Sequence, residues 1–208
     1  MKVIYEDDNI RVLDKPTGIN ADDIPKRVHR LDKDTSGILL VAKNDKALEF
    51  LQKQFAERKV EKKYLALVVG NLKNKDGVIE TFLGRSPKDK RKQKVYLPHE
   101  PSAKGKREAI TKYGVLQRFK DYDLIGVEPK TGRKHQIRTH LAYSGHPIAG
   151  DKLYGFKNQP CPKGLTRQFL HANYLKIKLP NGETKEFQSE LPKDLKDVII
   201  HFLRPQEM

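Results

Sequence analysis

Short apolar runs separated by turn residues recur along the chain, and their order limits the fold more than any other feature of the sequence. Residues 3–19 contain two strand-like segments around the polar turn at 6–9, followed by a break at Pro16 and Gly18. The continuous apolar stretch at 38–42 is too short for an independent helix and long enough for a buried strand. Further strand patterns, the last with the alternation of an edge-of-core strand, lie at 64–69, 77–83, 109–119, 122–129 and 174–179.

Three segments have the spacing of helices. One at 45–58 places its apolar residues on a single stripe, one at 135–144 ends at Gly145, and one at 191–202 is the last element of the chain. Strands are therefore many, helices are few, and the two do not alternate regularly. The sequence predicts an α+β fold with a mixed, largely antiparallel β-sheet core and a few flanking helices, in place of a doubly wound nucleotide-binding fold.

The balance of charge favours a polyanionic partner. Lys and Arg number 42 against 27 Asp and Glu, which gives a formal net charge of +15 over 208 residues. Such an excess over a whole domain is typical of nucleic-acid-binding proteins, whereas an isolated charge run is more often a solvated face. The segment 85–107 alone carries nine Lys or Arg residues with Pro, Gly and Ser between them. We expect it to form a mobile basic loop within one domain that spans 1–208.

Several common classes of protein and site are excluded. Cys161 is the only cysteine, so no disulfide can form within the chain, and we expect a cytoplasmic protein because no signal-peptide or membrane-spanning segment is present. The glycine spacing at 145–150 is that of a phosphate-binding loop, but Asp151 follows where Lys is needed. His135 and His140 are five apart, which places them on different faces of a helix, so we expect no metal site.

One run of residues and four further segments, in the same order, resemble a known family. The run HRLDKDTSGILL at 29–40 resembles the signature of the RluA-type pseudouridine synthases, which isomerise specific uridines in ribosomal or transfer RNA. VIYEDDNIRVLDKPTGI resembles the opening segment of that family, KKYLALVVG its tyrosine segment, GRKHQIRTHLAYSGHPIAGDKLYG its arginine segment and LHANYLKIKLP its last segment. The resemblance implies the pseudouridine synthase catalytic fold, an RNA substrate and no cofactor.

The chain departs from the family pattern at a few points. The stretch between Pro16 and His29 is shorter than usual, and Lys134 stands where Thr is common. The chain also begins at the opening segment, so we expect a catalytic domain without the small N-terminal RNA-binding domain of many relatives. These departures affect a loop near the expected site and the local charge, and they leave the expected catalytic residues intact.

The resemblance assigns the chemistry to three residues. Asp32 is the essential carboxylate, which either attacks C1′ of the uridine or removes the 2′ proton. Arg138 keeps that carboxylate ionised in a water-poor pocket, and Tyr64 packs against the base, where a phenol can stack and hydrogen-bond at once. Taken singly, each residue could equally be an ordinary turn, helix or strand residue. Their joint occurrence favours the catalytic interpretation.

Two further residues are expected to contact the RNA. A uridine in folded RNA must leave its stack before an enzyme can reach C1′, and the resemblance gives Arg30 the place that the base vacates. It gives Leu175 an apolar contact with the uracil ring. We expect His29, Thr35 and Ser36 to shape the loop that carries Asp32.

Asp34 follows Asp32 by two residues, and we expect it to face away from the pocket or to pair with a Lys, because two ionised carboxylates side by side would repel. Ser36 lacks the strand-turn-helix setting of a nucleophilic serine, so a serine triad is not expected.

Two other functions remain open at this point. A nucleoside or glycoside-type hydrolase would break the same bond, although such enzymes ordinarily use two carboxylates and the sequence offers one. An RNA-binding protein without activity would keep the basic surface but has no need for the three expected catalytic residues. The identity of the RNA, and the choice between ribosomal and transfer RNA, cannot be derived from these patterns.

Overall fold

The computed structural model describes residues 1–203, which fold as two compact units. The first unit contains residues 1–64 and 170–192, and the second contains residues 65–169 and the segment that begins at Lys193. Strand β4 (Glu61–Val69) passes from the first unit into the second. The sheet is mixed and largely antiparallel, and three α-helices accompany it, so the predicted α+β class is confirmed.

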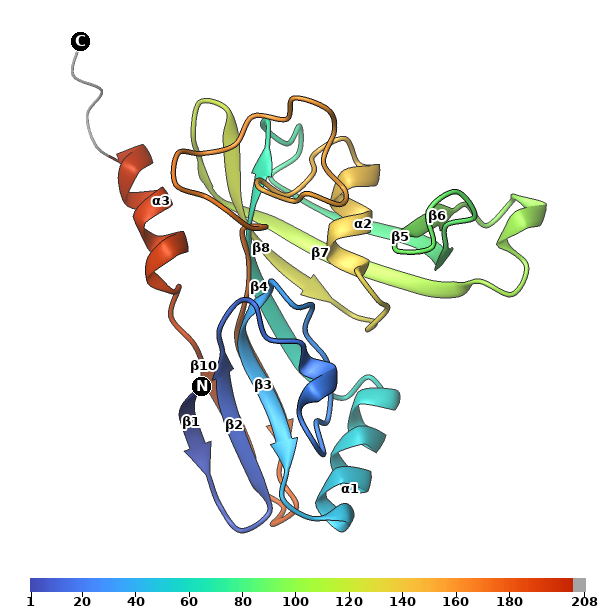
Figure 1. The fold of residues 1–208 in the computed structure, drawn as a ribbon. Coiled ribbons are helices and arrows are strands. Elements are labelled where there is room, and N and C mark those ends of the chain that lie inside the picture. The colour runs from blue at the N-terminus through green and yellow to red at the C-terminus, as the bar shows by residue number, and fades with distance from the viewer. Residues whose placement is uncertain (204–208) are drawn as a thin grey trace. The chain divides into compact units, whose positions relative to one another are not determined.

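The first unit is built on a sheet with the order β1-β2-β3-β9, with β10 paired to β9 (Figure 1). The β3–β9 pairing is parallel, and the other pairings between these five strands are antiparallel. The expected opening hairpin is present as β1 and β2. The strand expected at the edge of the core, β9, instead pairs with both β3 and β10. The strand bounds are Lys2–Glu6 for β1, Ile10–Lys15 for β2, Ser36–Ala42 for β3, Leu170–Lys178 for β9 and Thr184–Gln188 for β10.

In the second unit, strands β8, β7, β5 and β6 pair antiparallel in that order, and β4 lies next to β8. Helix α2 (Gln136–Tyr143) contacts β6, β7 and β8. Figure 1 shows α2 lying against these strands. The strand bounds are Asp76–Arg85 for β5, Gln93–Tyr96 for β6, Arg107–Arg118 for β7 and Tyr122–Pro129 for β8.

All three expected helices are present, and each has a local reason for its bounds. In α1 (Asp45–Ala56), the side chain of Asn44 accepts a hydrogen bond from the backbone of Ala47 and so caps the N-terminus. The end of α2 is set by Gly145, whose φ of +85° a residue with a side chain adopts only at a cost. Helix α3 (Lys193–Leu203) buries Leu195 and Val198. Two short 3-10 helices span Ala21–Asp23 and Pro101–Ala103.

The basic segment 85–107 is more ordered than expected. It contains β6 and the second 3-10 helix, and Val95 and Tyr96 of β6 are buried against β5. Residues 93–96 therefore form a strand where the sequence predicted a loop, because this short strand is surrounded by charged residues and shows little of a strand's pattern.

Strand β3 supplies apolar side chains to both of its faces. Ile38 and Leu40 belong to a core cluster that includes residues of α1, and Leu39 belongs to a second cluster with Leu31 and Ala172. A strand buried on both faces explains why 38–42 is continuously apolar. Among residues 1–203, no helix is long and apolar enough to cross a membrane.

Candidate active site

Asp32 lies in the turn that leads into β3, and backbone hydrogen bonds hold that turn at both ends. The backbone N–H of Thr35 donates to the carbonyl of Asp32 at 3.0 Å. The carbonyl of the next residue, Lys33, accepts from the backbone of Gly18 and from the Nζ of Lys15, both at 3.0 Å. The carboxylate of Asp32 therefore projects from a segment whose backbone is fixed from both sides.

Lys15 is a buried lysine that the sequence interpretation did not single out. It is 0% exposed, and its ammonium also donates to the carbonyls of Pro16 and Ile19, each at 2.9 Å. Burying an ammonium is costly unless polar groups replace its water, and these carbonyls do so. The sequence feature that could have indicated this buried lysine is its place at the end of an apolar strand, directly before Pro16. Lys15 ties the end of β2 to the turn that carries Asp32.

A second anchor joins the same turn to β9. The side chain of Ser36 lies 3.0 Å from Nδ1 of buried His171, and Nε2 of His171 lies 3.1 Å from the carbonyl of Ser189. At the adjacent position, a Cβ on Gly37 would lie 2.2 Å from the carbonyl oxygen of Ala172. Only glycine allows the two backbones to approach this closely. Ser36 thus has the structural place expected for it.

His29 is also structural, as expected. Its Nε2 accepts a hydrogen bond from the backbone of Leu40 at 3.1 Å, and its ring stacks on Phe55 with centroids 4.9 Å apart. Burial, together with the charge of Lys62, lowers the pKa of His29 to about 3. The imidazole is therefore neutral near pH 7 and serves as a hydrogen-bond acceptor.

Tyr64 lies in the part of β4 that belongs to the first unit and packs against the cluster formed by Ala21, Leu31, Leu39 and Ala172. Burial raises the pKa of its hydroxyl, and the negative charge of Asp32 raises it further. The phenol therefore keeps its proton at neutral pH and can act as a donor. Tyr64 also packs in the same cluster as Leu31, the residue directly before Asp32.

Arg30 and Leu175 have very different surroundings in the first unit. Arg30 is exposed, and its Nη2 lies 3.5 Å from the carboxylate of Asp22. Leu175 is 2% exposed within the cluster that contains Ile38 and Leu40. Because successive side chains of a strand alternate between faces, Leu175 points away from the face on which Ala172 packs with Tyr64. The burial of Leu175 supports a role in core packing. The contact with uracil that the resemblance assigned to Leu175 stays a prediction, and the direction of the side chain does not support it.

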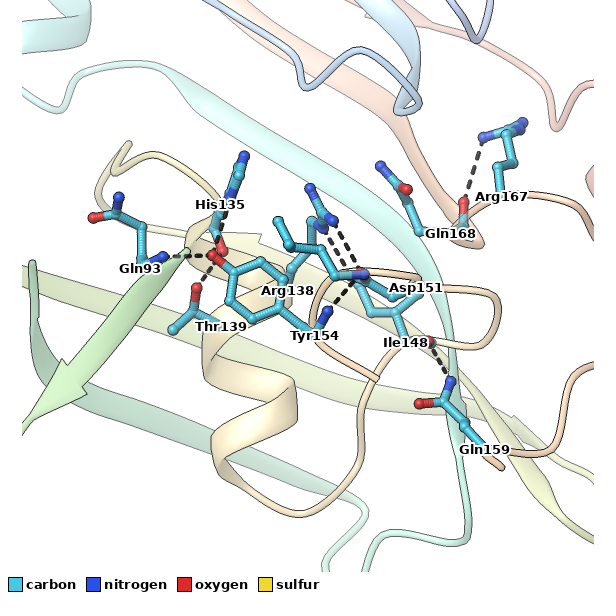
Figure 2. A network of polar contacts seen from close by, with 11 residues as sticks. Gln93, His135, Arg138, Thr139, Ile148, Asp151, Tyr154, Gln159, Arg167 and Gln168 are labelled. Carbon is cyan, nitrogen blue, oxygen red and sulfur yellow. Dashed lines mark hydrogen bonds and ion pairs between the residues drawn. The ribbon is translucent and has the colours of Figure 1, made fainter. Parts of the chain in front are cut away.

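Arg138 lies on α2 in the second unit and pairs with Asp151 through two hydrogen bonds (Figure 2). Nε donates to Oδ2 at 2.7 Å and Nη2 donates to Oδ1 at 2.9 Å, with side-chain exposures of 8% and 0%. Burial alone would raise the pKa of Asp151, but the hydrogen bonds from Arg138 and from the backbone of Leu153 and Tyr154 lower it. This is a buried, bidentate ion pair that fixes the plane of the guanidinium.

Tyr154 completes the surroundings of Arg138. Its ring centroid lies 5.1 Å from Cζ of Arg138, and its hydroxyl accepts a hydrogen bond from the backbone of Gln93 at 2.7 Å. Nδ1 of His135 lies 2.9 Å from the same hydroxyl, as Figure 2 shows. The sequence patterns did not predict Asp151 or Tyr154 as site residues. Asp151 was considered only as the residue that follows the rejected phosphate-loop pattern. The role of both residues depends on a loop that returns to α2.

Buried polar residues also fix α2 itself. Gln136 hydrogen-bonds to the side chain of Thr131 at 2.7 Å and to that of Thr111 at 2.9 Å. His140 lies between the hydroxyls of Thr111 and Thr81, at 2.9 and 3.0 Å. Burial lowers the pKa of His140 to about 4. Both histidines therefore have structural contacts: His140 lies on α2 two residues after Arg138, and His135 precedes the helix, three residues before Arg138.

Of the five expected site residues, four lie in the first unit and Arg138 lies in the second. The expected neutralisation of Asp32 by Arg138 and the expected orientation of Asp34 both stay predictions. Among residues 1–203, no group of three or more His, Cys, Asp or Glu side chains could hold a metal ion. The first unit therefore offers a carboxylate on a fixed turn and a buried phenol, and the second offers a guanidinium held in one orientation.

Comparisons with known proteins converge on one family. The family described as "RNA pseudouridylate synthase" matches residues 6–143. The chain is 36% identical to "Ribosomal large subunit pseudouridine synthase D" of Borreliella burgdorferi, over 99% of this chain and 70% of that protein. It is also 36% identical to "Ribosomal large subunit pseudouridine synthase C" of Vibrio parahaemolyticus, over 95% of this chain and 68% of that one.

A solved structure agrees. "Human RNA Pseudouridylate Synthase Domain Containing 1" has a TM-score of 0.80 and 27% identity, covering 94% of this chain and 86% of the human chain.

Proposed function

The chain belongs to the RNA pseudouridylate synthase family and is an RNA isomerase, and we propose that Asp32 is the carboxylate on which its conversion of uridine depends. The observation that carries the proposal is the fixed turn of Asp32, whose preceding residue, Leu31, lies in the cluster against which Tyr64 packs. A reaction at C1′ needs an ionised carboxylate held in one position, since misplacement by about 1 Å can cost roughly 10²-fold in rate.

The reaction breaks the bond between C1′ and N1 of the base and forms a bond between C1′ and C5. A proton is lost from C5 and one is gained at N1, so no redox partner or external group is required. Asp32 would either attack C1′ or remove the 2′ proton, and the phenol of Tyr64 would donate to or stack on the base. The raised pKa of Tyr64 supports the donor role, because the hydroxyl remains protonated.

Arg138 is proposed to balance the charge of Asp32 during the reaction. Its pair with Asp151 uses Nε and one terminal nitrogen, on one edge of the guanidinium. A guanidinium stays positively charged at neutral pH, so it can stabilise an ionised carboxylate without giving up a proton. The bidentate pair with Asp151 supports this role, because it holds the guanidinium in one orientation.

Arg30 is proposed to occupy the gap in the RNA that the flipped uridine leaves. It is exposed, and its contact with Asp22 is a surface ion pair at 3.5 Å, of a kind worth about 0–1 kcal/mol. Such a contact is easily exchanged for one with RNA. A planar guanidinium can stack between bases and bind phosphate, which an aliphatic side chain cannot do.

Ribosomal RNA is the proposed substrate class, because the curated relatives with a named substrate act, by their names, on the large ribosomal subunit. The net charge of +15 supports a polyanionic substrate but does not distinguish ribosomal from transfer RNA. Ribosomal RNA transcripts are therefore the first substrates to test, with transfer RNA as the comparison.

The deciding experiment replaces Asp32 by Asn, which keeps the size of the side chain and removes its charge. Pseudouridine formation in ribosomal RNA should fall below detection, whereas RNA affinity should stay nearly unchanged because it rests mainly on phosphate contacts. Asp34→Asn is the matched control, since it removes the neighbouring carboxylate, and it should retain activity. Normal activity of the Asp32→Asn variant would disprove the assignment, and release of free uracil by the wild-type protein would indicate hydrolysis.

A further inference from the structure

Two lysines lie beside the ring of Tyr96, one from strand β6 and one from the residue directly before β7. The Nζ atoms of Lys94 and Lys106 lie 5.0 and 5.1 Å from the ring centroid of Tyr96. Tyr96 is 5% exposed, and its hydroxyl donates to the carbonyl of Arg85, so the ring is held in place. Both ammonium groups therefore lie close to one fixed aromatic ring, and each is attracted to it by a cation–π interaction.

A glycine makes room for this arrangement. Gly84 of β5 pairs with Lys94, and a Cβ on it would lie 2.5 Å from Cδ of Lys106 and 3.3 Å from the ring of Tyr96. The aliphatic part of Lys106 thus crosses β5 at the place where a side chain is missing. The absence of a side chain at Gly84 and the packing around Tyr96 therefore determine where the ammonium of Lys106 lies.

The same strand leads to the site on α2. The backbone of Gln93 donates to the hydroxyl of Tyr154, as Figure 2 shows. The ring of Tyr154 has the Nζ of Lys92 at 6.0 Å and the Cζ of Arg138 at 5.1 Å from its centroid. Each of these two tyrosine rings therefore has two cations near it, and one of the two cations at Tyr154 is Arg138.

The acid nearest to Lys92 in the sequence is already bound by an arginine. Asp89 is bound by Arg91 through two hydrogen bonds at 3.0 and 2.8 Å. Among residues 1–203, Lys92, Lys94 and Lys106 form no ion pair within 4.0 Å with a carboxylate, unlike Lys176 with Glu186 and Lys193 with Asp197. Positive charges that converge without a counter-charge favour binding of an anion that can contact several of them at once.

We propose that Lys92, Lys94 and Lys106, held by Tyr96 and Tyr154, form a lysine surface that binds consecutive phosphates of one RNA strand and leads it toward Arg138. A phosphodiester strand is the partner that fits, because it carries one negative charge per nucleotide at regular spacing. Tyr96 is buried and positions the lysines without stacking on bases. That the polyanion is RNA rests on the proposed function.

The test is the salt dependence of binding to a fluorescein-labelled oligouridylate. On single strands each phosphate contact contributes about 0.7 to the slope of log K against log salt, so Lys94→Gln with Lys106→Gln should flatten the slope by roughly 1.4. Gln keeps most of the aliphatic stem, and an unchanged midpoint of thermal unfolding would verify the fold. The catalytic efficiency kcat/KM on ribosomal RNA should fall with the affinity.

The matched control removes the same charge from lysines that have acidic partners, by Lys176→Gln with Lys193→Gln. Its slope should change by clearly less than that of the Lys94 and Lys106 variant. An unchanged slope in the test variant, or an equal change in the control, would overturn the proposal. If the wild-type protein formed no pseudouridine, the proposed function would fail, and the comparison of slopes would still decide whether the lysine surface binds a phosphodiester strand.

Discussion

Ser36 and His171 share a buried hydrogen bond of 3.0 Å whose direction can be assigned. Nε2 of His171 faces the carbonyl of Ser189, which can only accept, so Nε2 carries the proton in the neutral ring. Nδ1 is then the acceptor and the Ser36 hydroxyl is the donor. The bond joins the start of β3 to β9 four residues after Asp32, and it ties the position of the carboxylate to a remote strand.

Two replacements of His171 should show whether the residue acts through this hydrogen bond or only by filling space. Asn can present an acceptor near the position of Nδ1 and keep the bond to Ser36, whereas Gln can present a donor near Nε2 and keep the contact with Ser189. If His171 positions Asp32 through Ser36, His171→Gln should lower kcat by roughly 10- to 100-fold and His171→Asn should lower it much less. Single-turnover pseudouridine formation at saturating RNA measures this difference.

Ser36→Ala supplies the control for the same bond. It should lower kcat about as much as His171→Gln, and the double variant should be no worse than either, since both changes remove one interaction. Additive losses, or equal losses for Asn and Gln at position 171, would assign His171 to packing alone.

Loss of Asp151 should destabilise the second unit. Asp151→Ala leaves a guanidinium buried with its bidentate partner removed, and the breaking of a buried pair typically costs about 3–5 kcal/mol. Urea unfolding should show this as a lower midpoint. Replacing both members, by Arg138→Met with Asp151→Leu, should cost less than Asp151→Ala alone, since no buried charge then remains. A midpoint for Asp151→Ala equal to that of the wild type would contradict a structural role for the pair.

Stability should decrease as pH falls from about 6.5 toward 4, because His140 binds its proton less readily when folded. Burial lowers its pKa from 6.5 to about 4, so between these values the unfolded chain binds more protons than the folded one. The loss should approach about 3 kcal/mol at the low end of this range. His29, whose pKa is lowered to about 3, adds a loss of the same sign.

Chemical denaturation at a series of pH values checks the prediction. His140→Asn removes one titrating group and keeps hydrogen-bonding capacity toward Thr81 and Thr111, so its profile should be flatter than that of the wild type over the same range. Equal profiles would show that His140 does not control the acid sensitivity.

Local patterns predicted the elements near Asp32 well, because their causes are local. The run at 38–42 is apolar since β3 is buried on both faces, and Gly145 ends α2 since its φ is positive. Strand β6 was missed because its burial depends on β5, a separate segment. The ammonium of Lys15 was missed because its acceptors come together only when the chain turns between Pro16 and Ile19.

The sequence predicted only in part which of the expected site residues lie together in the structure. The resemblance grouped Asp32 with Tyr64, and both lie in the first unit, where Tyr64 packs in the same cluster as Leu31. It placed Leu175 at the uracil, whereas strand alternation counted from Ala172 turns that side chain into the core. The partner of Arg138 in the described structure, Asp151, is thirteen residues away and was interpreted only as a reason against a phosphate loop.

The route of the chain has a consequence for any attempt to divide the protein. The backbone leaves the first unit after Tyr64, re-enters it at Leu170 and leaves it again at Lys193, so neither unit is an uninterrupted stretch. Removing the last helix would take away Asp194, whose carboxylate binds buried Arg167 at 2.7 Å. Dissection into autonomous fragments would therefore require re-joining separated segments by circular permutation or by designed linkers.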